Sequence, residues 1–69
     1  MTANTYKYVE IIGSSTQGSD DAISNAIAKA SNSLDHLEWF EVLETRGHIV
    51  NGLVAHWQVT IKIGFRLED

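Results

Sequence analysis

The most regular pattern in this sequence lies near its C-terminal end, where apolar and polar residues alternate from residue 55 to residue 67. An alternation with a period of two is typical of a β-strand with one buried face, and the β-branched residues favour the same structure. We expect this strand to run from residue 53 to residue 67. Its thirteen alternating residues span about 43 Å, so the rest of the chain must cover a long apolar face. The apolar side carries Ala55, Trp57, Val59, Ile61, Ile63, Phe65 and Leu67.

Two further strands and one helix are predicted upstream. Residues 6–12 read as a first strand, which the turn-forming cluster at 13–18 ends. Residues 19–33 read as a helix: Ser19 has the profile of an N-cap, and Asp20 and Asp21 follow where negative charge meets the positive end of the helix dipole. Apolar residues then recur at three- and four-residue spacing, at Ile23, Ala26, Ile27, Ala30 and Leu34.

Residues 37–49 read as a second strand, and the Asn51-Gly52 pair after it is a strong signal for a two-residue hairpin turn. Such a turn sets a register in which the numbers of paired residues sum to 103. The apolar residues of the two strands then face one another, with the pairs Phe40–Ile63 and Val42–Ile61. A bulge near Gly47 would change the pairing beyond it.

Together these elements predict an α+β fold with the order β–α–β–β, in which one helix packs on the apolar face of a three-stranded antiparallel sheet. The 69 residues make a single domain, residues 1–69, with a marginal core and no cysteine to reinforce it. Trp39 and Leu43 fall on a sheet face that no element of the chain can cover. Exposed apolar surface on a small domain marks an interface or a ligand site, and we therefore expect a homo-oligomer.

Composition narrows the class of function. The net charge of −4, with only five basic residues, argues against general binding to nucleic acid or to a membrane surface. No apolar run approaches a membrane span and no signal peptide is evident, so a cytoplasmic protein is expected. His36, His48 and His56 are not spaced as metal ligands on one element, and no metal site is predicted. No serine has the flanking motif of a nucleophile.

Trp39 and Gln58 are the residues most suited to a ligand. Trp39 is either an anchor at an oligomer interface or a stacking platform for a planar ligand, because the register places it opposite Gly64, which has no side chain to obstruct a flat ring. Gln58 lies on the same face, where its amide could read the donor–acceptor edge of a heterocycle. Alone on a strand, it could equally be solvated surface.

Three segments resemble the bacterial branch of the dodecin family: YKYVEIIGSS (6–15), WFEVLETRGHI (39–49) and NGLVAHWQVTIKIGFRLED (51–69). The resemblance covers nearly the whole chain, although Trp57 stands where tyrosine is more usual. It implies β–α–β–β subunits assembled as a hollow homo-dodecamer that binds flavins and is not an enzyme. The implied role is flavin storage or buffering.

The same resemblance implies roles for individual residues. Trp39 matches the tryptophan that stacks flavins in pairs between symmetry-related subunits and quenches them, and Gln58 matches the glutamine that reads the flavin edge. Bacterial members favour FMN, with riboflavin or another flavin as the alternative here, and Arg46 and Arg66 are candidates for the phosphate; some members also bind coenzyme A. The alternatives are a flavin-dependent oxidoreductase and a purely structural homo-oligomer in which Trp39 only packs.

The register adds a condition to these roles. Gln58 opposes Thr45, which is six residues from Trp39, or about 20 Å along the strand. A ring that touches both side chains must therefore join two subunits, unless a bulge shortens the distance. Arg46 faces away from Trp39 in this register.

Overall fold

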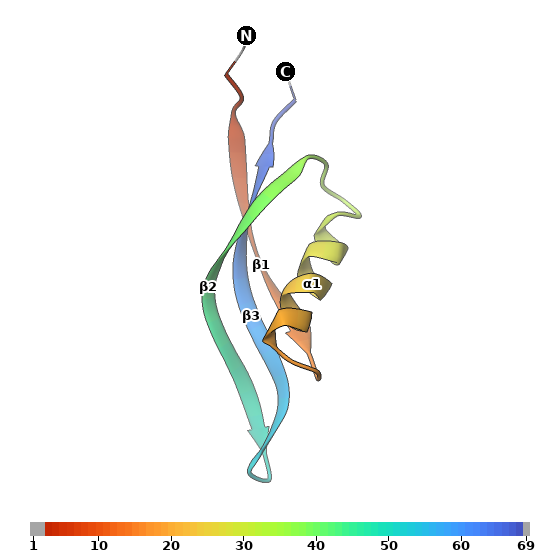
Figure 1. Ribbon diagram of the computed structural model, residues 1–69, viewed down its shortest axis with the longest axis vertical. Coiled ribbons are helices and arrows are strands. Elements are labelled where there is room, and N and C mark those ends of the chain that lie inside the picture. Colours follow the sequence, from red (N-terminus) through yellow and green to blue (C-terminus); the bar gives the residue numbers. More distant parts are fainter. Residues whose placement is uncertain (1–2, 69) are drawn as a thin grey trace.

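The computed structural model describes residues 3–68 and contains one helix packed on a three-stranded antiparallel sheet (Figure 1). The predicted order β–α–β–β is confirmed, with β3 in the centre of the sheet between β1 and β2. The molecule is elongated, 56 × 20 × 13 Å, because the hairpin of β2 and β3 extends well beyond the helix. The elements are β1 (Tyr6–Ser15), α1 (Ser19–Ala30), β2 (Leu37–Val50) and β3 (Leu53–Arg66).

Three predicted boundaries are wrong, at the end of β1 and at both ends of the helix. β1 continues to Ser15 instead of ending at residue 12, because residues 13–15 pair with β3. The helix ends at Ala30, three residues early, and its N-cap is Gly18, whereas Ser19 is already helical. No side chain caps the start of this helix; Ser15 Oγ instead accepts the backbone N–H of Gln17 at 2.8 Å, within the turn that precedes the helix.

The core lies between α1 and the two strands β1 and β3. Its buried side chains are three alanines of the helix and three branched residues of β3: Ala22, Ala26, Ala30, Val59, Ile61 and Ile63. The helix approaches β1 so closely that a Cβ on Gly13 would lie 2.1 Å from the carbonyl oxygen of Ala22. The small residues therefore set how deeply the helix sits on the sheet.

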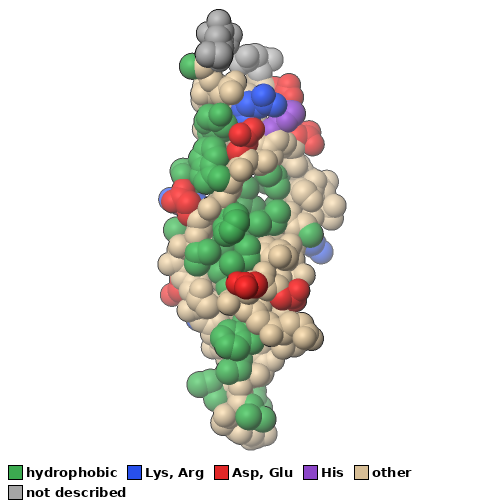
Figure 2. Space-filling model, viewed as in Figure 1, with side chains coloured by type: hydrophobic (Ala, Val, Ile, Leu, Met, Phe, Trp, Pro, Cys, Tyr) green, Lys and Arg blue, Asp and Glu red, His purple; other side chains and the backbone are tan. Residues whose placement is uncertain are grey.

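β2 is not covered by the helix. Phe40 and Val42 face the helix side of the sheet, as predicted, but they remain 45% and 48% exposed. Figure 2 shows hydrophobic side chains gathered between β2 and α1, and an open pocket of about 130 Å³ lies there, lined in part by Ile27 and Phe40. The single helix thus covers two of the three strands.

The hairpin register is partly as predicted. The pairs Phe40–Ile63 and Val42–Ile61 are confirmed. Between Val42 and Glu44 the pairing skips Leu43, and between His48 and Ile49 it skips Ala55 on the opposite strand. These two bulges shift the segment between them by one residue and then restore the register. The sequence allows for a bulge near Gly47, but no residue type marks the bulge at Leu43.

Candidate functional site

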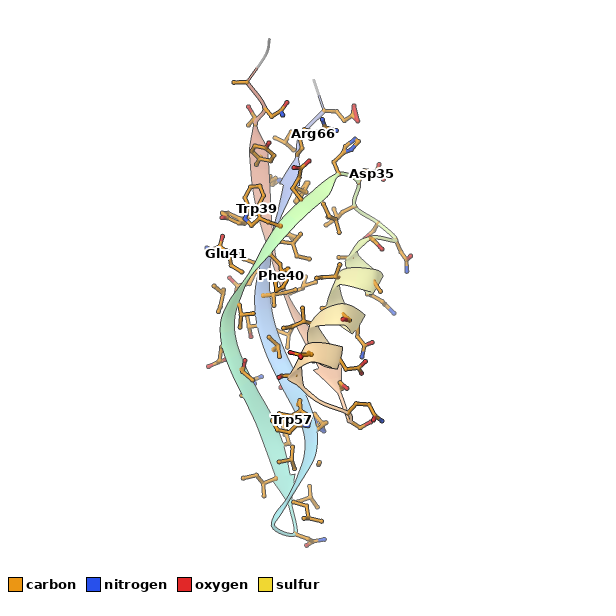
Figure 3. All side chains as sticks on the ribbon, viewed as in Figure 1. Asp35, Trp39, Phe40, Glu41, Trp57 and Arg66 are labelled. Atoms are coloured by element: carbon orange, nitrogen blue, oxygen red, sulfur yellow. The ribbon has the colours of Figure 1, made fainter. Side chains whose placement is uncertain are left out.

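The sheet face turned away from α1, which we call the open face, holds two groups of interacting side chains. The aromatic cluster comprises Tyr6, Tyr8, Trp39 and Glu41. The amide cluster comprises Ser14, Arg46, His48 and Gln58. In Figure 3, Trp39 and Glu41 point away from the helix side of the sheet, whereas Phe40 points toward it.

The aromatic cluster is built around the indole of Trp39. The pair Trp39–Gly64 is confirmed, and β1 brings Tyr8 to the other side of Gly64. A Cβ on Gly64 would lie 2.3, 2.4 and 2.7 Å from three indole atoms, so the ring itself lies broadside on the glycine. Tyr6 and Tyr8 flank the indole edge-on, with ring centroids at 5.1 and 5.8 Å. The absence of a side chain on Gly64 thus makes room for the indole of Trp39 itself.

Hydrogen bonds hold the edge of the indole. Its Nε1–H donates to the hydroxyl of Tyr8 at 3.3 Å and to Glu41 Oε2 at 3.4 Å, and the hydroxyl of Tyr8 donates to the same carboxylate. The bond from Tyr8 stabilises the ionised carboxylate, which lowers the pKa of Glu41, and the same bond raises the pKa of Tyr8. Gly64 therefore supports one ring face and these bonds fix the edge, while the side chain of Trp39 stays partly exposed.

The amide cluster lies nearer the hairpin turn. Arg46 Nε donates to Gln58 Oε1 at 3.0 Å, and His48 Nε2 lies 3.3 Å from the same oxygen. The predicted pair Gln58–Thr45 is wrong, since the bulge at Leu43 pairs Gln58 with Arg46 instead. The same bulge turns Arg46 onto the open face that carries Trp39, so the expectation that Arg46 faces away is also wrong.

Arg66 lies at the aromatic end of the open face, paired with Tyr6. Its Nη2 donates to His36 Nδ1 at 3.1 Å, and His36 also contacts Glu68 through Nε2. The four predicted site residues therefore fall into two pairs, Trp39 with Arg66 and Gln58 with Arg46. β3 has no bulge between Gln58 and Gly64, so the two pairs are about 20 Å apart, and one planar ring cannot touch both within one chain.

Sequence reasoning missed Tyr6, Tyr8, Glu41 and His48 as site residues. The two tyrosines share one face of the first strand in the sequence pattern, but their contact with Trp39 depends on β1 pairing with β3, which was not predicted. Within residues 3–68, no group of three histidine, cysteine or acidic side chains is placed to hold a metal ion. No helix in that part of the chain has the length and apolar character needed to cross a membrane.

A protein-family model described as Dodecin matches residues 5–68. The chain belongs to the dodecin family. Among its relatives, the dodecin of Thermus thermophilus is 48% identical over 64 residues, which cover 93% of each chain. Family members are small-molecule-binding proteins rather than enzymes.

Solved dodecin structures share the fold. The dodecin of Streptomyces coelicolor has a TM-score of 0.95 at 51% identity and covers 100% of this chain and 99% of its own. That of Streptomyces davaonensis has a TM-score of 0.95 at 50% identity, with 99% and 100% coverage. Variants of the Thermus dodecin, one with a tryptophan changed to phenylalanine and two with an arginine changed to alanine, match at a TM-score of 0.93.

Proposed function

We propose that this dodecin binds flavins, FMN foremost, in pairs stacked between the Trp39 indoles of symmetry-related subunits, and that it stores or buffers them. The observation that carries the proposal is the placement of Trp39 on the open face. Its indole rests on the backbone of Gly64, is braced by two tyrosines and remains 38% exposed. A planar indole held in this way matches an isoalloxazine ring, because both surfaces are flat and aromatic. Electron transfer from the stacked indole would quench the excited flavin.

The spacing of the two clusters supports a site shared between subunits. Trp39 on β2 and Gln58 on β3 lie too far apart within one chain to hold a single ring, but Trp39 of one subunit and Gln58 of another can do so. The exposed strand β2 supplies apolar surface for the contacts between subunits. We propose the family's homo-dodecamer as the assembly. Light scattering should then give a particle many times larger than the 7.7 kDa chain.

The arginines provide the charge for a phosphate. Arg66 lies beside the aromatic cluster and Arg46 beside Gln58, so a shared site brings an arginine from each subunit toward a ligand's phosphate. The residues replaced in the Thermus variants are spaced along that chain as Trp39, Arg46 and Arg66 are spaced here. Coenzyme A, which also carries phosphates, is a second candidate ligand for the same arginines.

A storage role fits the stacked arrangement better than catalysis. Two flavins stacked between indoles have both ring faces covered, and those faces are where a hydride would be transferred. The proposal therefore assigns binding residues and no catalytic residue. Oxidation of NADH by the flavin-loaded protein would contradict it.

Substitution of Trp39 by alanine tests the proposal. Loss of stacking and of the buried indole surface should weaken flavin binding at least tenfold, which corresponds to about 1.4 kcal/mol. Flavin that still binds should fluoresce more strongly, since the electron donor is gone. Titration of flavin fluorescence measures both effects, and a sizing run should show an intact particle.

Trp57→Phe is the matched control, because Trp57 pairs with Gly47 and Ser15 far from the aromatic cluster (Figure 3). It should leave flavin affinity and quenching unchanged. A Trp39→Ala particle that dissociates, together with a wild type that binds no flavin, would show instead that Trp39 only packs subunits together. Strong quenching that persists in an intact Trp39→Ala particle would contradict the electron-transfer mechanism.

A further inference from the structure

The side-chain amide of Gln58 has a fixed direction in the amide cluster. An amide oxygen only accepts hydrogen bonds, and the guanidinium Nε–H of Arg46 only donates, so the contact of 3.0 Å must involve Oε1. His48 Nε2 lies 3.3 Å from the same oxygen and must therefore carry a hydrogen. Two donors thus converge on the oxygen of Gln58, and reversing the amide would set its NH₂ group against both of them.

The opposite end of the amide faces β1. Gln58 Nε2 donates to the hydroxyl of Ser14 at 3.5 Å, the long limit of a hydrogen bond. The NH₂ group has two hydrogens, and within residues 3–68 its acceptor is the hydroxyl of Ser14. With its oxygen engaged twice, Gln58 presents an N–H donor to a ligand and offers little capacity to accept.

His48 is held in place by a second histidine. His48 and His56 are directly paired across β2 and β3, and their rings stack with centroids 4.4 Å apart and planes inclined by 22°. Arg46, in contrast, has a long flexible side chain that a phosphate can attract away from Gln58. His48 would then be the donor that still fixes the amide.

We propose that His48 is a specificity-determining positioning residue, which holds Gln58 so that its N–H group meets a carbonyl oxygen on the edge of the ligand. This inference rests on the proposed function and deepens it. It selects ligands by the acceptor they present: the pyrimidine edge of a flavin carries two carbonyl oxygens, and a thiocarbonyl at the same position accepts a hydrogen bond poorly. His48 itself does not touch the ligand and acts through Gln58.

The test compares riboflavin with thio-analogues in which the oxygen at position 2 or 4 is replaced by sulfur. The wild type should bind riboflavin more tightly than at least one analogue. His48→Phe keeps a ring to stack on His56 but removes the donor, and it should weaken riboflavin binding about two- to tenfold, as expected for one neutral hydrogen bond. The preference for oxygen over sulfur should shrink at the same time, which a merely structural role would not produce.

Two further variants complete the design. His48→Gln restores an N–H donor and should recover part of the affinity and of the oxygen preference. Thr60→Val removes a hydroxyl from the same face, two residues along β3 from Gln58, and should change neither. Unchanged affinity and preference in an intact His48→Phe particle would overturn the role of His48 and leave flavin binding standing. A wild type that binds no flavin would overturn both proposals.

Discussion

The two faces of the sheet differ in the types of side chain that they carry and in the interactions that those side chains make. The helix side is dry and apolar, with Val59, Ile61 and Ile63 buried against the alanines of α1. The open face is polar and aromatic, and its side chains interact by hydrogen bonds and edge-on ring contacts while staying at least partly exposed. Burial of apolar area dominates folding free energy, whereas exposed polar contacts contribute little. Stability and ligand recognition are therefore assigned to opposite faces.

β2 departs from this division. Phe40 and Val42 lie on its helix side and are apolar, yet they are nearly half exposed because α1 packs mainly on β1 and β3. In a single chain, the apolar side chains on the helix side are buried on β3 but remain exposed on β2. We expect neighbouring subunits to complete it, which makes β2 the strand at which stability and assembly meet.

The largest expected effect is on the helix side. Ile61→Ala leaves a cavity beneath the helix and should lower the free energy of unfolding by about 2–5 kcal/mol. Val42 faces Ile61 across the hairpin, so Val42→Ala is a matched variant on the uncovered strand. In denaturant titrations at equal protein concentration, Val42→Ala should lower the free energy of unfolding by less than Ile61→Ala does. It should instead shift the oligomer equilibrium toward smaller species. Equal losses of stability with no change in particle mass would break the contrast between β2 and β3.

The next effect belongs to the open face. If Arg66 contacts a phosphate, Arg66→Ala should weaken FMN binding about ten- to a hundredfold, the range for a hydrogen bond to a charged group, and riboflavin binding much less. Arg46→Ala is expected to act similarly and also to disturb Gln58, so its effect on riboflavin should be the larger of the two. Neither variant should change the unfolding midpoint. Equal losses for both ligands would remove that arginine from the phosphate site.

Glycines on the helix side offer a sharper comparison. A Cβ at Gly13 would press on the carbonyl of Ala22, so Gly13→Ala should force the helix off β1 and cost about 1–3 kcal/mol. Nothing lies within 4 Å of a Cβ at Gly18, and its φ of 165° is extended backbone that alanine adopts freely. Gly18→Ala should therefore lower the melting temperature much less, by no more than alanine's weaker preference for an N-cap position. Similar melting temperatures for both variants would show that α1 does not sit as deeply on the sheet as described.

The smallest effect concerns the hydroxyl of Tyr8. Its bond to Glu41 lowers the pKa of Glu41 below the ordinary 4.5, so this interaction is complete above pH 4.5 and is lost as the pH falls through the lowered value. It raises the pKa of Tyr8 above 10.0, so the interaction is complete below pH 10.0 and is lost as the pH rises through the raised value. Between these limits the aromatic cluster should not respond to pH.

Tyr8→Phe should move the acid transition of Trp39 fluorescence to higher pH and leave the melting temperature almost unchanged. The measurement uses a Trp57→Phe background, in which Trp39 is the one remaining tryptophan of the sequence. An acid transition at the same pH in both proteins would show that Tyr8 does not hold Glu41 in solution.

Local patterns were enough to predict most of the fold, because alternation, helical spacing and the Asn51-Gly52 turn each depend on neighbours in sequence. The register set by this turn correctly predicted the pairs Trp39–Gly64 and Phe40–Ile63. The face of Arg46 did not follow from it, because one unpaired residue at Leu43 reverses the alternation, and nothing in the residue types around it marks a bulge. The tyrosines beside Trp39 were missed for a related reason, since they depend on a pairing between β1 and β3 that joins distant segments of the chain.

The bulge at Leu43 also determines where this hairpin can change its length. Leu43 has no partner on β3, so a chain lacking it keeps every pair on both sides, including Trp39–Gly64 and Arg46–Gln58. Removal of Thr45 would also eliminate the extra residue of β2, but it would turn Glu44 from the open face toward the helix side. Leu43 is therefore a position of β2 at which a residue can be deleted without exchanging the contents of the two faces, and it lies between the aromatic and the amide clusters.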